Sequence, residues 1–160
     1  MSKSLKRVIR ALADLGLSAP TEVKEQTRTA QEAADVLGVS LDQIGKSIIL
    51  CGEESGQVFL FLTAGGNQVD TDRAAALAGE PLGRADAQLI RETTGFAIGG
   101  VSPLGHVRPT PTWMDRRLLD FDVIWCAAGT PRHNFPADPS VLATAIGAQI
   151  ADFAAPAEKM

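Results

Sequence analysis

Lys46 is the residue whose type and position most directly suggest chemistry. It stands in the segment IGKSIIL, immediately before the apolar run SIILC, which is typical of a strand buried at the centre of a sheet. Burial of an ammonium group costs desolvation free energy unless an anionic group faces it. Lys46 is therefore a candidate to hold an anionic part of a ligand. The alternative is a lysine whose long side chain reaches solvent from the strand edge.

Glycine-rich segments are the second candidate feature. FAIGGVSPLGH contains Gly99, Gly100 and Gly105, and CAAGT contains Gly129. Because glycine has no Cβ, it lets the main chain come close to a ligand and point amides or carbonyls at it. The alternative, for each of these glycines taken alone, is a role in a turn only.

Two motifs that would give these residues other roles are excluded. A phosphate-binding loop needs a glycine at position 40, where the chain has Ser40, and a helix after Lys46, where the pattern predicts a strand. A nucleophile elbow needs a glycine where the chain has Leu104, and Pro103 next to Ser102 disrupts its strand-turn-helix geometry. The sequence therefore favours neither a nucleotide triphosphatase nor a serine hydrolase.

Histidines and cysteines do not assemble into a metal site or a triad in this sequence. The chain has two of each, His106, His133, Cys51 and Cys126, all widely separated and without a CxxC, HxxxH or HxE pair. Both cysteines lie in apolar runs and are interpreted as buried free thiols. We therefore expect neither a metal nor a cofactor.

Helices and strands alternate irregularly around these candidates. Apolar residues at helical spacing, together with capping residues, predict helices over residues 3–15, 29–38, 73–78, 87–93 and 139–146. The runs SIILC and VFLFLT predict a largely buried hairpin at the centre of a sheet, and short strands are expected before Gly99 and Gly129. This order favours an α/β (α+β) fold, a mixed sheet wrapped by helices. The tail AAPAEKM is expected to be frayed.

Composition limits the class of protein. With 160 residues and 45% hydrophobic content, we expect one domain over residues 1–160. The net charge of −4 argues against non-specific coating of nucleic acid, which needs many contacts between phosphates and basic residues. Lys3, Lys6, Arg7 and Arg10 can still form a local basic patch, or merely a solvated helix face. No apolar run approaches the ~20 residues that cross a bilayer, so a soluble, cytoplasmic protein without membrane contact is expected.

Three blocks of the sequence resemble a known family. TAQEAADVLGV with IGKSIIL, TGFAIGGVSPLGH, and WCAAGTPRHNF occur in the order found in the YbaK/ProX family of free-standing aminoacyl-tRNA deacylases. These are relatives of the editing insertion domain of bacterial prolyl-tRNA synthetases. The resemblance covers about residues 20–150 and implies a mixed, barrel-like sheet flanked by helices.

The resemblance also implies site residues. A near-invariant lysine that opens the first central strand matches Lys46, a G-x-x-x-P loop matches residues 99–103, and an A-G-T-x-x-H-x-F element matches residues 128–135. Some members carry Asn or Thr where this chain has Ser47, a position that could touch the terminal adenosine. The residues implied for catalysis are Lys46, Gly99, Gly100 and Ser102, and those implied for substrate binding are Ser47, Ile98, Val101, Pro103, His106, Gly129, Thr130, His133 and Phe135.

On this basis we expect the acceptor end of a mischarged tRNA to enter a pocket between the Lys46 strand and the two glycine loops. The ester carbonyl would face the amides of residues 99–102, which stabilise the developing oxyanion. Lys46 would bring positive charge and help to hold a water or the ribose hydroxyl for attack. Ile98, Val101 and Phe135 are expected either to wall the pocket or to be plain core.

The expected substrate is tRNA carrying a small amino acid, such as tRNA for proline charged with alanine or 2-aminobutyrate, and a tRNA synthetase is a further expected partner. Two alternatives use the same pocket. One is a non-catalytic RNA- or nucleotide-binding module, and the other is a hydrolase of a different small acyl ester. The sequence does not indicate the oligomeric state.

Overall fold

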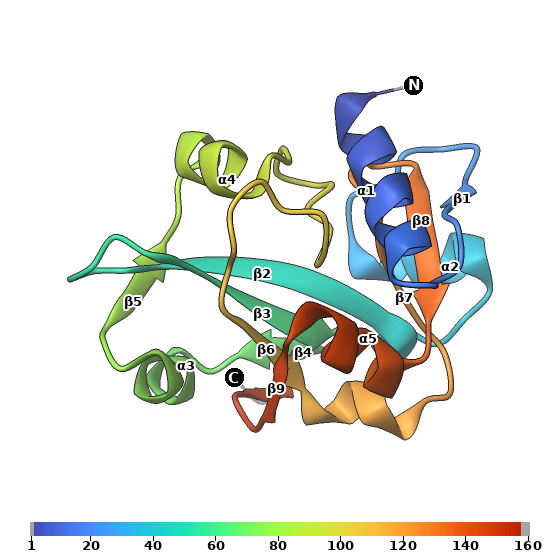
Figure 1. Cartoon of the computed structure of the whole chain (residues 1–160). Helices are drawn as coiled ribbons and strands as arrows, with labels where there is room; N and C mark the ends of the chain where they lie inside the picture. Colours follow the sequence, from blue (N-terminus) through green and yellow to red (C-terminus); the bar gives the residue numbers. More distant parts are fainter. Residues whose placement is uncertain (1, 158–160) are drawn as a thin grey trace.

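The computed structural model describes residues 2–157 (Figure 1). Within these residues, five α-helices, two short 3-10 helices and ten strands follow one another. In order they are α1 (Lys3–Asp14), β1 (Thr21–Glu22), α2 (Ala30–Leu37), η1 (Leu41–Gln43), β2 (Ile44–Gly52), β3 (Val58–Ala64), β4 (Asn67–Val69), α3 (Thr71–Ala78), β5 (Leu82–Arg84), α4 (Ala87–Thr94), β6 (Thr112–Asp115), η2 (Arg116–Asp120), β7 (Ile124–Ala127), β8 (His133–Ala137), α5 (Pro139–Ile146), β9 (Gln149–Ala151) and β10 (Ala154–Pro156).

Eight of the strands form one mixed sheet in the order β1-β8-β7-β2-β3-β6-β9, with β5 paired to the far end of β2. The hairpin of β2 and β3 lies at its centre, as the two apolar runs predict. β2 pairs in parallel with β7, and β3 pairs in parallel with β6. The separate pair of β4 and β10 makes a small second sheet. The expected mixed sheet flanked by helices is therefore confirmed.

Side chains alternate between two cores, one on each face of the central hairpin. On one face, Leu60 and Leu62 pack with the buried stripe of α1 and with α5. On the other face, Phe61 stacks on Trp113 with ring centroids 5.1 Å apart and meets Phe153 edge to face. On β2, odd-numbered side chains such as Ile49 therefore belong to the first core, and even-numbered side chains such as Ile48 belong to the second.

The helix starts follow the capping residues in the sequence. Thr29 accepts a hydrogen bond from the amide of Glu32 and starts α2, while Asp70, Asp86 and Asp138 cap α3, α4 and α5 in the same way. Glycines in the left-handed conformation end these four helices. No described helix is long and apolar enough to cross a membrane.

Three expectations need correction. The segment before Gly99 is a loop, because Gly95 (φ +84°) ends α4 and the Gly100 amide then closes a turn onto the Ala97 carbonyl. In the tail, residues 154–156 form strand β10, since the neighbouring Phe153 is fully buried and anchors them, and residues 158–160 lie outside the described part.

The third correction concerns burial in the central hairpin. β3 is buried throughout, whereas β2 is only half-buried from Lys46 to Cys51. Cys51 is thus a half-buried free thiol, while Cys126 is fully buried, which raises the pKa of its thiol to about 12. β2 is exposed because its outer side is paired with other strands only near its two ends. The candidate site lies at the unpaired stretch between them.

Candidate active site at the free edge of β2

The side of β2 that faces away from β3 is paired at its two ends and open in the middle. β7 covers Ile44 and Gly45, and β5 covers residues 50–52. Between them, residues 46–49 pair with β3 alone among the described strands. A cavity of about 810 Å³ occupies this gap, within the size range of small-ligand sites.

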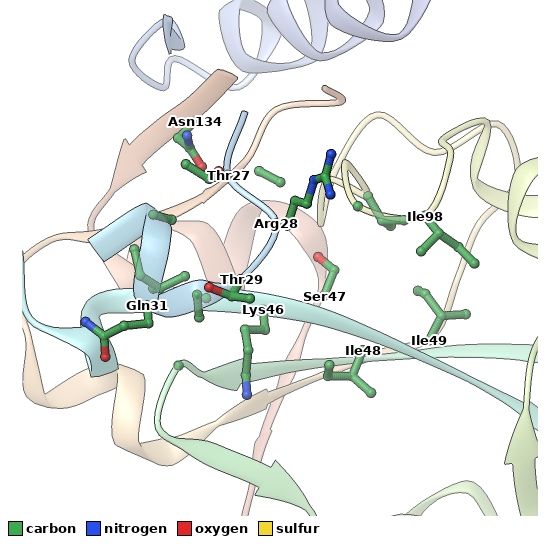
Figure 2. A pocket seen from close by; sticks show the side chains of 18 of the residues that line it. Thr27, Arg28, Thr29, Gln31, Lys46, Ser47, Ile48, Ile49, Ile98 and Asn134 are labelled. Carbon is green, nitrogen blue, oxygen red and sulfur yellow. The ribbon is translucent and has the colours of Figure 1, made fainter. Parts of the chain in front are cut away.

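Most of the wall comes from β2, from the segment that leads into α2 with the first turn of that helix, from the end of β5 with one residue of α4, and from the loop after α4 (Figure 2). Single residues of η1, of the turn after β3, of β7 and of β8 complete it. The lining residues used below are Arg28, Lys46, Ser47, Ile49, Arg84, Ile90, Ile98, Gly99 and Val101. Ile98 is 64% exposed although it is large and apolar, so this wall presents hydrophobic surface to an incoming ligand.

Ser47 presents its main-chain amide and carbonyl to the cavity, and its hydroxyl is buried beside it. The amide of Gly52 donates to the Gln57 carbonyl. In this antiparallel ladder, the main-chain amides and carbonyls of even-numbered residues of β2 therefore bond to β3, and those of odd-numbered residues point away from β3. The amide and carbonyl of Ser47 therefore point toward the open edge. The Oγ of Ser47 is buried and has no hydrogen-bond partner within residues 2–157. Unsatisfied groups of this kind are costly unless a ligand or water completes them.

Lys46 projects from the opposite face of β2 to Ser47 (Figure 2). Its Nζ donates to the carbonyl of Asn67, 2.6 Å away, at the start of β4. Burial lowers the pKa of the Lys46 ammonium, while the carboxylates of Asp115 and Asp42 act in the opposite direction. The cavity thus wraps around the edge of β2 and reaches both the Lys46 side and the Ser47 side.

The loop after α4 is held from outside the cavity. Arg7 of α1 donates to the carbonyls of Gly95 and Gly105, at 2.9 and 2.8 Å, and its guanidinium lies 4.7 Å from the centroid of Phe96. Arg7 therefore braces both ends of the loop and is not part of a free basic patch on α1. The Gly100 amide is already used by Ala97, and the loop residues that line the cavity are Ile98, Gly99 and Val101.

His106 has a structural place beneath the same loop. Its Nε2 donates to the carbonyl of Ser102 at 2.6 Å, and its Nδ1 lies 2.9 Å from the Thr110 hydroxyl. Burial lowers the pKa of His106, the bond to Ser102 opposes this, and the charge of Arg7 lowers it further. A neutral imidazole that donates from Nε2 therefore anchors the loop.

The remaining residues implied by the resemblance lie apart from the cavity. Ser102 and Phe135 are fully buried, and the Ser102 hydroxyl accepts from the Leu104 amide. Thr130 and His133 bond to each other at 2.6 Å and line a separate depression with Ser2 and Glu22. The structure thus brings together five of the implied residues, which are Lys46, Ser47, Ile98, Gly99 and Val101, and places Gly100, Ser102, Pro103, His106, Gly129, Thr130, His133 and Phe135 outside the lining.

Gly100 supports the packing of the two glycine loops on each other. A Cβ at this position would lie 3.0 Å from both the Cα and the amide nitrogen of Thr130. The sequence alone predicts that Gly100→Val damages activity more than stability, since the branched side chain would block the ester. With this backbone contact we instead expect a loss of about 1–3 kcal/mol of stability, typical of overpacking, with activity falling in parallel.

The measurement for Gly100→Val is the thermal midpoint beside the deacylation rate. Ala97→Val, at an exposed position of the same loop, is the matched control and should leave the midpoint unchanged. A Gly100→Val protein as stable as wild type but inactive would restore a direct role in the site.

Comparison with known proteins places this geometry in a family. The model of the aminoacyl-tRNA editing domain matches residues 24–145. The chain belongs to the aminoacyl-tRNA editing domain family. The match spans β2, the cavity and both glycine loops of the editing domain, and it confirms the resemblance drawn from the three sequence blocks.

Three known proteins are similar to this chain over most of its length. It is 30% identical to "Uncharacterized protein YwhH" of Bacillus subtilis over 122 residues, which is 76% of this chain and 77% of that protein. It is 23% identical to the "Putative Cys-tRNA(Pro)/Cys-tRNA(Cys) deacylase EbsC" of Enterococcus faecalis, over 80% of this chain and 78% of that one. A crystal structure of "a putative trans-editing enzyme for prolyl tRNA synthetase" superposes with a TM-score of 0.88 and 44% identity, covering 96% of this chain and 98% of that chain.

Sequence reasoning missed several residues around the cavity of this editing domain. Arg28 and Arg84 both line it, and both are exposed and without an ion pair among the described side chains. Arg28 precedes the capping residue Thr29, so its position beside a helix start was the available signal. Asp115, the last residue of β6, lies outside the cavity and was also missed. Its contacts are with Ala64 and Asn67, which are about 50 residues away in the sequence, so no local pattern indicated them.

Proposed function

We propose that this chain is a trans-editing hydrolase that deacylates tRNA mischarged with a small amino acid. The observation that carries the proposal is the cavity at the free edge of β2, where an anchored lysine and an unsatisfied serine meet the glycine loop of an aminoacyl-tRNA editing domain. The proposed substrate is tRNA for proline that carries alanine or 2-aminobutyrate.

In this proposal the terminal adenosine and its ester lie across the edge of β2. The Ser47 amide and hydroxyl, together with the amides of Gly99 and Val101, are donors on the side of the ester carbonyl and stabilise the oxyanion as it forms. Lys46 supplies positive charge and positions a water or the ribose hydroxyl for attack. Arg28 and Arg84, which line the cavity, bind phosphates of the acceptor strand in this proposal.

An ester of this kind is activated, so positioning and charge stabilisation are sufficient without a strong side-chain base. The need for such an enzyme follows from the limited selectivity of a synthetase pocket, which rejects a substrate that differs by one methylene only about 10–200-fold. A second, smaller site then removes the errors. The relatives named for tRNA(Pro) deacylation and for prolyl-tRNA synthetase editing support this choice of tRNA.

The test is a deacylation panel with purified protein. tRNA for proline is charged in turn with alanine, 2-aminobutyrate, serine, threonine, cysteine and proline, and the release of amino acid is followed with time. We expect rapid turnover of the alanyl or 2-aminobutyryl form. Binding of tRNA without turnover of any form would identify a non-catalytic RNA-binding module, and turnover of simple acyl esters without tRNA would identify a different esterase.

A further inference from the structure

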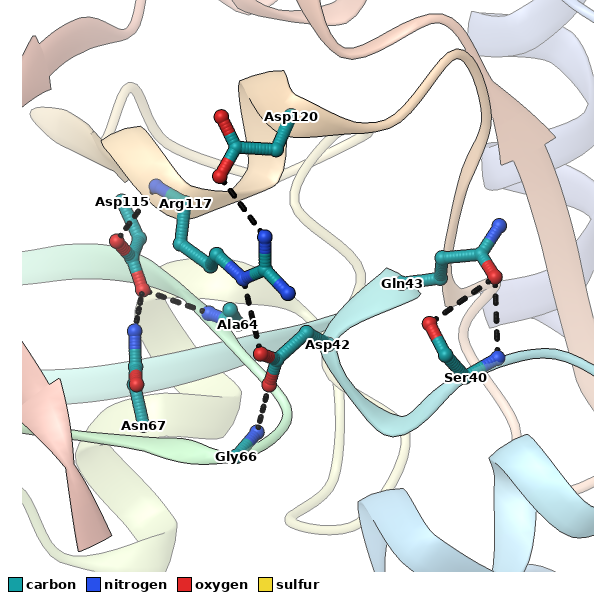
Figure 3. Close-up of polar contacts among 9 residues, drawn as sticks. All are labelled: Ser40, Asp42, Gln43, Ala64, Gly66, Asn67, Asp115, Arg117 and Asp120. Atoms are coloured by element: carbon teal, nitrogen blue, oxygen red, sulfur yellow. Dashed lines mark hydrogen bonds and ion pairs between the residues drawn. The ribbon is translucent and has the colours of Figure 1, made fainter.

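Asp115 is a buried carboxylate that lies outside the cavity and has no place in the mechanism above. It ends β6 and is 5% exposed. Its Oδ2 accepts from the Ala64 amide at 3.0 Å and from the Asn67 side-chain amide at 2.8 Å, and its Oδ1 accepts from the Arg117 amide at 3.0 Å (Figure 3). Three donors from two separate segments thus converge on one carboxylate.

The Asn67 contact connects this carboxylate to the active site. The side chain of Asn67 is held by Asp115, and the main-chain carbonyl of the same residue accepts from Lys46 Nζ. Asp115 also holds Ala64, the last residue of β3, just before the turn that leads to Asn67. Ala64 lies directly opposite Gly45, the neighbour of Lys46. Asp115 therefore fixes both sides of the turn that carries the acceptor for the lysine.

A second carboxylate closes the same turn from the other side. Asp42 accepts from the Gly66 amide at 2.8 Å and from Arg117 Nε at 2.9 Å, and Arg117 also pairs with Asp120 (Figure 3). The turn also lies close against η1, because a Cβ on Gly65 would overlap the Leu41 carbonyl. A turn braced at Ala64, Gly66 and Asn67 can hold a flexible lysine side chain in one direction.

We propose that Asp115 is a positioning residue for Lys46, acting through Asn67 and the turn between β3 and β4. The proposal rests on the deacylase function proposed above for its kinetic part. Asp115 does not touch the substrate. It restricts the ammonium group to one location, beside Asn67 on the face of β2 opposite Ser47, so that the positive charge is already in place when the ester arrives.

Asp115→Asn is the sharpest variant for this proposal, since it keeps the size of the side chain. An asparagine has one acceptor oxygen, whereas three donors face this position, so its NH₂ group must point at another N–H. One main-chain amide, of Arg117 or of Ala64, then loses its acceptor, and in the second case the Asn67 side chain must also turn over to keep a bond. Asp120→Asn is the matched control in the same network, because Asp120 is 61% exposed and contacts only the outer arm of Arg117.

Two measurements separate positioning from a purely structural role. The first is kcat and KM for deacylation, where we expect Asp115→Asn to lower kcat at least tenfold while KM stays within about twofold. The second is the ¹H–¹⁵N spectrum of the lysine side chains, with the Lys46 signal assigned by its loss in Lys46→Ala. A hydrogen-bonded, half-buried ammonium should exchange slowly in wild type and in Asp120→Asn, and should lose this protection in Asp115→Asn.

The outcomes are distinct. Retention of the protected Lys46 signal and of kcat in both Asp115→Asn and Asn67→Ala, with only the thermal midpoint lowered, would overturn the proposal, as would the absence of a protected Lys46 signal in wild type. If Asp115→Asn does not fold, Asn67→Ala decides, since it removes the side-chain link and keeps the main-chain carbonyl. The spectrum needs no substrate, so a failure of the deacylase function shows itself separately in the kinetics of wild type.

Discussion

Lys46→Ala is expected to fold normally and to lose nearly all deacylase activity. The substitution removes the positive charge that Lys46 holds beside Asn67, while the strand keeps its pairing with β3. The pKa of Lys46 is lowered by burial, which means that its charged form pays a desolvation penalty in the folded state, so its removal should change stability little. The measurements are the rate of deacylation under single-turnover conditions and the thermal midpoint.

Lys24→Ala is the control for Lys46→Ala, because Lys24 is an exposed lysine that does not line the cavity. It should keep wild-type activity. Retention of more than about a tenth of the wild-type rate in Lys46→Ala corresponds to a change of only ~1.4 kcal/mol in the barrier and would contradict the proposed role.

Sequence patterns predicted the elements well, because their causes are local. The capping residues Thr29, Asp86 and Asp138 and the glycines that end the helices act within a few residues of themselves. The central hairpin was also predictable, since two apolar runs joined by a short polar stretch have few other arrangements. Lys46 was identified as a site candidate for the same local reason, as a charge at the start of an apolar strand.

The shape of the site could not be predicted, because it depends on which strands pair with β2. The gap at residues 46–49 exists only because the pairing of β7 with β2 ends at Gly45 and the pairing of β5 with β2 begins at Leu50. No residue in the gap reveals either limit. The face to which Lys46 points, and its bond to Asn67, follow from the register of the hairpin and from a turn 21 residues away. Gly100 and Gly129 were interpreted as ligand-facing, whereas Gly100 meets Thr130 and Gly129 lies close to Ser4 and Phe96.

Substrate selection should come from the size of the cavity on the Ser47 side. A second editing site must admit a small mischarged residue and refuse proline, and attraction discriminates poorly because each buried CH₂ contributes only about 0.8 kcal/mol. Steric exclusion of the rigid proline ring discriminates more strongly than attraction does. The walls available for it are Ile49, Ile90, Ile98 and Val101, which line the cavity, whereas Phe135 is fully buried and lies outside the lining.

We expect rapid hydrolysis of alanyl- and 2-aminobutyryl-tRNA, negligible hydrolysis of prolyl-tRNA, and a widened range in Val101→Ala. Val101 is 8% exposed and belongs to both the cavity wall and the main core, so its truncation opens space beside the ester and also lowers stability. Val58→Ala controls for the second effect, since Val58 is equally buried on β3 but does not line the cavity. The measured quantity is the ratio of kcat/KM for alanyl-tRNA to that for prolyl-tRNA, which should fall at least tenfold in Val101→Ala and stay constant in Val58→Ala. Comparable rates on prolyl-tRNA and the small mischarged forms in wild type would refute size exclusion, because such an enzyme would destroy the correct product as fast as the error.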